Sequence, residues 1–195
     1  VQDTTFYPQS GDYAVTYSVY GAGGSGVATQ TVPIANTVEL PCEGTLALLT
    51  GCDNQKTWIF SGEAGAISVG PQPGSSEWYS SPVAGLVPEQ YDDSYQFTTD
   101  GEYFYDNNGC TVNPYEGYVV TELAVPDTLS YLLFDGAGLN GEDQIYLPQD
   151  EFGFCWFMGV WDAGPTFDIV ELTEDRLVVS APIQLGDCTN GEGYF

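Results

Sequence analysis

Glycine and proline interrupt this chain too often for it to form long helices. The 195 residues include 24 glycines and 12 prolines, and both residue types are unfavourable inside a helix. The longest stretch without either runs from Thr166 to Ala181, and it has the pattern of a β-hairpin. Apolar and polar residues alternate from Phe167, a polar turn follows at 172–176, and an apolar strand returns at 177–179. The chain is therefore predicted to be all-β and antiparallel.

The same alternation predicts two further hairpins. Aromatic strands flank a turn at 98–101, where Asp100-Gly101 suits the positive φ angles of a tight hairpin. Residues 13–20 also alternate, and 27–34 are expected to pair with them across a glycine-rich turn. A short helical turn is expected at 45–49.

The charge of the chain excludes several classes of partner. Asp and Glu number 28 against one lysine and one arginine, Lys56 and Arg176, and there is no histidine, so the formal net charge is −26. Nucleic acid, anionic membranes and phosphorylated substrates need basic residues, and histidine-dependent catalysis or metal binding cannot be built. The chain is also 43% hydrophobic and 14% aromatic, which indicates a folded protein. Carboxylate chemistry, hard-cation binding and neutral partners remain, and a neutral polysaccharide fits best.

Five cysteines without zinc-site spacing predict disulfides in an exported protein. Cys42 and Cys52 form the easiest loop closure. A second pair is expected among Cys110, Cys155 and Cys188, and the sequence does not choose between them. Cys155 lies in an apolar run, so we expect it to be a buried free thiol. No apolar run is long enough to span a bilayer, so no membrane insertion is expected.

The composition changes after residue 36, behind a strand pair that is too small to fold alone. We expect a partial β-domain at 1–36, a linker at 37–44, and a larger β-domain at 45–195. The first part contains four short motifs in order: Phe6-Tyr7-Pro8, Gly11-Asp12-Tyr13, 15–19 and Gly23-Gly24. In these motifs it resembles the C-terminal half of a PKD domain, an immunoglobulin-like sandwich that recurs as a spacer in secreted glycan-degrading proteins. The signature of the N-terminal half of that family is absent, so we expect the domain to be truncated.

The larger part contains a series of segments in a characteristic order: 48–51, Lys56-Thr57-Trp58, 63–66, 69–71, Trp78-Tyr79-Ser80, 91–97, Asp100-Gly101, 167–169 and 172–179. In these segments it resembles a domain of surface glycan-binding and laminarin-utilisation proteins of Bacteroidota. The resemblance implies an antiparallel β-sandwich or flattened lipocalin-like barrel, whose last strand would follow Phe195. It also implies a place on the cell surface, extracellular or on the outer membrane, among other domains or subunits of a surface assembly.

Tryptophans are the first candidates for a sugar site, because sugar C–H faces stack on flat rings. Trp78 and Tyr79 lie in a stretch rich in Gly, Pro and Ser at 70–85, and loops often carry function. The alternative is that Trp78 folds back as a plug over the end of the barrel. Trp58, at the start of a strand, is expected in the core.

Trp156 and Trp161 form a second candidate pair. They are five positions apart, so in a regular strand they point to opposite faces, and at most one belongs simply to the core. Trp161-Asp162 lies beside Gly164-Pro165 and is the better surface candidate. Trp156, Trp161 and Asp162 are all predicted to contribute to ligand binding.

Calcium is the candidate cofactor, since it binds carboxylate and amide oxygens. Asp92, Asp106 and Asn108 are the predicted ligands, and ordinary turn chemistry is the alternative. Catalysis is not predicted. A glycosidase needs two carboxyl groups at a suitable distance, and among 28 acidic residues some pair will satisfy this by chance, so their abundance is no evidence for catalysis.

The sequence therefore predicts a non-catalytic carbohydrate-binding module that holds a neutral polysaccharide, a β-glucan such as laminarin, by aromatic stacking. The main alternative is a structural spacer or adhesin module without a glycan site of its own. Exposure of Trp78 and Trp161 on one concave face favours binding, and burial of both favours the spacer. A glycosidase fragment would require a cleft with paired carboxylates.

Overall fold

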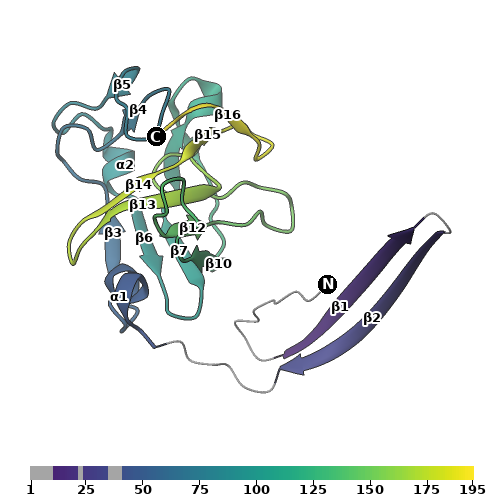
Figure 1. Ribbon diagram of the computed structural model, residues 1–195. Coiled ribbons are helices and arrows are strands. Elements are labelled where there is room, and N and C mark those ends of the chain that lie inside the picture. The colour runs from purple at the N-terminus through teal and green to yellow at the C-terminus, as the bar shows by residue number, and fades with distance from the viewer. Residues whose placement is uncertain (1–10, 22–23, 35–40) are drawn as a thin grey trace. The chain divides into compact units, whose positions relative to one another are not determined.

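The computed structural model describes residues 11–21, 24–34 and 41–195, and it is all-β with antiparallel sheets, as predicted. The chain divides into two compact units, Val1–Pro41 and Cys42–Phe195. Figure 1 shows the elements of both units, which are described separately here.

The first unit contains one long hairpin, formed by β1 (Gly11–Gly21) and β2 (Gly24–Ile34). The predicted pairing is confirmed, with Tyr13 opposite Val32 and Gly21 opposite Gly24. Tyr13, Val32 and Ile34 are half-buried, and the other described side chains of the hairpin are exposed. The segment Phe6-Tyr7-Pro8 and Gly23 lie outside the described residues.

Two four-stranded antiparallel sheets form the body of the second unit. The first sheet has the order β10-β7-β6-β3, and the second has the order β11-β12-β13-β14. In Figure 1, β13 and β14 cross in front of β3 and β6 of the first sheet. The strands are β3 (Thr57–Ile59), β6 (Ser94–Phe97), β7 (Glu102–Asp106), β10 (Leu129–Ser130), β11 (Leu132–Phe134), β12 (Gln144–Tyr146), β13 (Thr166–Leu172) and β14 (Leu177–Ser180).

Alternating residues of both sheets build one core. On β6 and β7 every second side chain is buried, and on β13 Phe167 and Ile169 are buried in the same way. These strands contribute to a single cluster because successive side chains of a strand point to opposite faces. Both predicted hairpins are confirmed by the β6–β7 and β13–β14 pairings. Trp58 joins the core as predicted, and its Nε1 donates to the Leu49 carbonyl at 3.0 Å.

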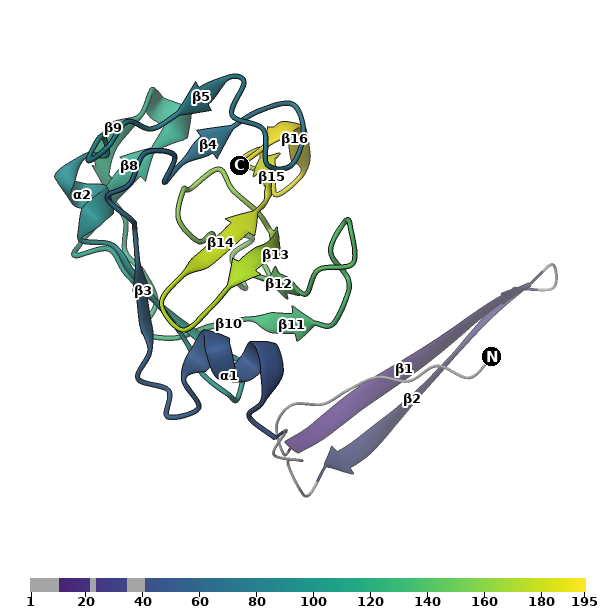
Figure 2. The same cartoon turned by 60° about the vertical axis from the view of Figure 1, so that its left-hand side comes forward.

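The expected helical turn is confirmed as α1 (Gly44–Thr50), which lies at one end of the unit. Short elements gather at the opposite end, around the C-terminus (Figure 2). They are β4 (Ser68–Val69), β5 (Tyr79–Ser80), α2 (Pro88–Tyr91), β8 (Cys110–Asn113), the 3-10 helix η1 (Pro114–Glu116), β9 (Val119–Glu122), β15 (Pro182–Gln184) and β16 (Asn190–Tyr194).

Two disulfides cross-link segments of the second unit. Cys42–Cys52 is confirmed. The prediction for Cys155 is wrong, because this residue is buried but bonded to Cys188, whose Cα lies 5.5 Å from its own. The segment after β15 folds back onto the apolar run at 154–157, and this tertiary contact has no local signal. Cys110 on β8 is the free cysteine among the described residues.

Candidate functional site

A cavity of about 620 Å³ lies among the short elements at the end opposite α1. Its lining includes four of the residues predicted to bind a ligand, namely Trp78, Tyr79, Trp161 and Asp162. These residues come from two segments about eighty positions apart, so the fold, and not local sequence, brings them together. Aliphatic side chains cover much of the remaining wall, among them Ile67, Val69, Leu86, Val112, Val160 and Ile183.

Trp78 is held in place by the last strand. Trp78 is 52% exposed, so it is not part of the buried core. The backbone N–H of Trp78 donates to the Val69 carbonyl at 3.0 Å, and its six-membered ring lies against Gly193 of β16. A Cβ at residue 193 would stand 2.3 Å from Cζ3 of that ring. Glycine is therefore required under the indole, and the neighbouring Tyr79 is also half-exposed.

Trp161 is fixed by other aromatic rings. It stacks on Phe157 with 5.7 Å between ring centroids and 14° between planes, and it meets Tyr115 edge-on at 6.4 Å. The buried Gln184 donates from Nε2 to the Trp161 carbonyl at 3.0 Å. A ring held on these sides is a rigid platform, so little conformational freedom is lost when a ligand stacks on it.

Asp162 is the only acidic side chain in the cavity lining. Burial away from water raises its pKa to about 6. Its backbone carbonyl accepts from the Gln184 N–H at 2.7 Å, which anchors the residue to β15. Gln184 of β15 therefore hydrogen-bonds both Trp161 and Asp162 and positions them relative to the same strand.

Asp93 is a buried carboxyl that the sequence analysis did not select. Its Oδ2 accepts from the hydroxyls of Tyr95 at 3.3 Å, Tyr105 at 3.2 Å and Thr111 at 3.2 Å. Its Oδ1 has no hydrogen-bond partner among the described residues. Burial, partly offset by these hydroxyls, raises the pKa of Asp93 to about 7.

This carboxyl lies directly behind the cavity wall. Thr111 belongs to the lining, and the Tyr95 hydroxyl also contacts the carbonyl of Gly159, another lining residue, at 3.1 Å. The alternation of Asp93, Tyr95 and Phe97 is the sequence signal that places Asp93 on the buried face. Its neighbour Asp92, a predicted calcium ligand, is exposed.

Trp156 does not belong to this site, and its assignment as a ligand-binding residue is corrected here. Its side chain is buried, it packs against Phe154, and its Nε1 donates to Asp150 Oδ2 at 3.1 Å. A ring enclosed in the core has no open face for a sugar. The irregular segment 154–163 turns both tryptophans away from the alternation of a regular strand.

The three predicted calcium ligands do lie together. The Asn108 side-chain amide donates to Asp92 Oδ2 at 3.2 Å, and its backbone N–H donates to Asp106 Oδ1 at 2.9 Å. The bond to Asp106 is that of an ordinary Asx turn, and the bond to Asp92 joins this turn to the segment before β6. The described part of the chain contains no group of three or more acidic or cysteine residues suited to a metal ion, so calcium binding stays a prediction.

No protein-family model matches this chain, and no curated protein matches it either. None of the described helices is long and apolar enough to cross a membrane. The case for a function therefore depends on the cavity and the residues that line it.

Proposed function

We propose that residues 45–195 form a non-catalytic carbohydrate-binding module that holds a neutral polysaccharide, a β-glucan such as laminarin, in this cavity. The observation that carries the proposal is the convergence of half-exposed Trp78 and Tyr79 with the fixed ring of Trp161 on one cavity. Indole and phenol rings bury the C–H face of a sugar without using charge. That mode of binding suits a protein with a net charge of −26.

The polar groups of the cavity suit binding better than hydrolysis. Hydrolysis by the common glycosidase mechanisms needs two carboxyl groups on either side of the scissile bond, whereas Asp162 is the only acidic side chain in the lining. One carboxylate suffices to accept hydrogen bonds from sugar hydroxyls. The presence of one acidic side chain in the lining, where hydrolysis needs two, supports the proposal of a non-catalytic module.

The proposal includes a location outside the cytoplasm, extracellular or on the outer-membrane surface. Two disulfides support it, because such bonds persist in oxidising compartments. We assign the β1–β2 hairpin to a PKD-like spacer of the same protein, so that neighbouring domains or subunits are its partners.

Affinity electrophoresis in gels containing laminarin or other neutral glucans tests the proposal, with calorimetry on soluble oligosaccharides. We expect retardation that Trp78→Ala weakens about two- to tenfold, since stacking contributes about 0.5–1.5 kcal/mol per ring. Phe152→Ala is the matched control, because Phe152 is a highly exposed aromatic residue outside the cavity lining. The absence of retardation across the panel would contradict the proposal and favour the spacer or adhesin module.

A further inference from the structure

Asp162 is an acid in a cavity to which this protein supplies no opposite charge. The chain has only two basic side chains, and both are engaged elsewhere. Lys56 donates to the Leu48 carbonyl at 2.5 Å and lies 4.4 Å from the centre of the Trp58 ring. A desolvated carboxylate without a cation is unfavourable, so a cation brought by a ligand would stabilise it.

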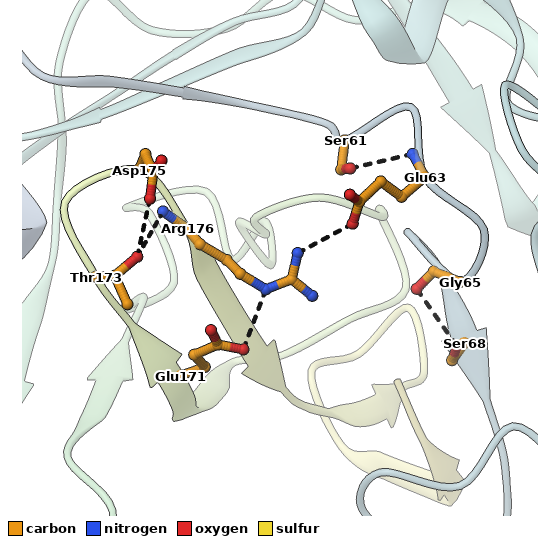
Figure 3. Close-up of polar contacts among 8 residues, drawn as sticks. All are labelled: Ser61, Glu63, Gly65, Ser68, Glu171, Thr173, Asp175 and Arg176. Carbon is orange, nitrogen blue, oxygen red and sulfur yellow. Dashed lines mark hydrogen bonds and ion pairs between the residues drawn. The ribbon is translucent and has the colours of Figure 1, made fainter.

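Arg176 is not available to pair with Asp162, because it already pairs with two other acidic residues. Its Nη1 lies 3.2 Å from Glu63 Oε2 and its Nε lies 3.0 Å from Glu171 Oε2, so the guanidinium bridges the β13–β14 hairpin and the segment before β4 (Figure 3). Neither Arg176 nor its two partners belong to the cavity lining. Neither basic side chain of the described residues therefore lies in the lining with Asp162, and a cation beside it would come from a ligand.

Aromatic faces surround the same cavity, and one of them is placed there by an unusual backbone. Tyr118 lines the cavity, is 71% exposed, and has a φ of +63°, which is uncommon for a residue with a bulky side chain. Such conformations are concentrated at functional sites. Burial and the charge of Asp162, which lines the same cavity, raise the pKa of Tyr118.

We propose that this cavity contains a subsite for an ammonium group, and that it prefers a sugar residue with a free amino group over its neutral counterpart. Trp78, Trp161 and Tyr118 present rings that attract cations by their π faces, and Asp162 supplies the counter-charge. A neutral sugar uses the stacking alone. The inference rests on the proposed sugar-binding function and adds a preference within it.

The test compares, on the whole chain, three ligands that share one sugar ring and differ only in the group at C2: the methyl β-glycosides of glucosamine, N-acetylglucosamine and glucose. Binding is followed by NMR through the indole N–H signals of the four tryptophans, at neutral pH and 0.15 M salt. We expect the signals of Trp78 and Trp161 to shift, and glucosamine to bind about fivefold more tightly than the other two.

Charge variants separate the subsite from general attraction to an acidic protein. Asp162→Asn is expected to abolish the preference for glucosamine. Glu174→Gln removes the same charge from the exposed β13–β14 turn, outside the cavity, and is expected to leave the preference intact. Thermal unfolding checks that both variants fold, and equal affinities of the unaltered chain for the three ligands overturn the inference even where a variant does not fold.

The experiment distinguishes failure of the amine preference from failure of the proposed sugar binding. Equal affinity for all three glycosides would overturn the amine preference and leave the proposed sugar binding in place. Indole signals that respond to none of them, and to no neutral oligosaccharide, would overturn both. A preference that survives Asp162→Asn, or that Glu174→Gln lowers equally, would assign the effect to general electrostatic attraction and overturn the subsite.

Discussion

At the residue scale, the strongest electrostatic feature of the fold is a single buried carboxyl. Asp93 receives three hydroxyl donors on one oxygen, while its other oxygen has no partner in the described part of the chain. Hydroxyl donors favour the ionised form and burial opposes it. Burial prevails, so the folded protein binds this proton more tightly than an unfolded chain does.

This imbalance predicts the pH dependence of stability. The pKa of Asp93 is about 7 in the folded protein against 3.8 ordinarily. Between these values the folded state holds more protons, so the free energy of unfolding falls as pH rises from about 4 to about 7. We expect Asp93→Asn to flatten this slope. The change in the free energy of unfolding between pH 5 and pH 8 should become smaller by about 2 kcal/mol. Urea unfolding at pH 5 and pH 8 measures it.

Asp92→Asn is the matched control for that experiment, because Asp92 is adjacent and exposed. It removes the same charge but not the buried carboxyl, and so it reports the general effect of an acidic surface. Identical pH slopes for the two variants would contradict the role assigned to Asp93.

At the element scale, β16 acts on the site through the absence of a side chain. Gly193 has a φ of +102° and lies under the Trp78 ring. Alternation of apolar residues cannot reveal such a role, because the relevant property is space and not hydrophobicity. Sequence analysis therefore selected Trp78 and Tyr79 from their loop composition, but it could not place β16 beneath them.

Gly193→Ala is expected to displace the indole and to weaken laminarin binding about tenfold, with a loss of about 1–2 kcal/mol of stability from the strained backbone. Calorimetry and urea unfolding measure the two effects. Gly186→Ala, in the turn between β15 and β16, is the control, since a Cβ there meets nothing within 4 Å. Wild-type affinity in Gly193→Ala would show that the position of the Trp78 ring is unimportant for binding.

One disulfide could be predicted from the sequence and the other could not. The Cys42–Cys52 bridge closes a short loop and could be predicted from spacing, whereas Cys155–Cys188 spans 33 positions and depends on how the segment after β15 folds back. The hairpins at 95–105 and 166–180 were predicted correctly for a related reason. Their pairing is local, so the alternation of the chain contains most of the information.

The second bridge yields a prediction about stability. Cys155→Ser is expected to lower the free energy of unfolding by about 3 kcal/mol, because it frees a long loop in the unfolded chain and removes a buried contact. Cys110→Ser is the control and is expected to change it by less than about 1 kcal/mol, since Cys110 has no disulfide partner among the described residues. Thiol titration of the denatured, unreduced protein should find one reactive cysteine. Three would contradict the second bridge.

At the scale of the whole molecule, the net charge of −26 sets how the protein responds to salt. Self-repulsion among the acidic side chains opposes the compact state, and salt screens it. We expect the unfolding temperature to rise by several degrees between 0.01 M and 0.15 M sodium chloride, as measured by calorimetry. Binding of a neutral glucan should barely change over the same range, because stacking does not depend on charge. A steep loss of glucan affinity with salt would contradict stacking as its main source.

The cavity wall joins segments from Ile67 to Phe195, and its tryptophan platform depends on β15 and β16. Contacts between such distant segments form late in folding, because the intervening chain must first be ordered. Binding competence should therefore appear after most of the core has assembled, in the last kinetic phase of refolding. No fragment that lacks β16 should retain the site, even where its two main sheets have formed.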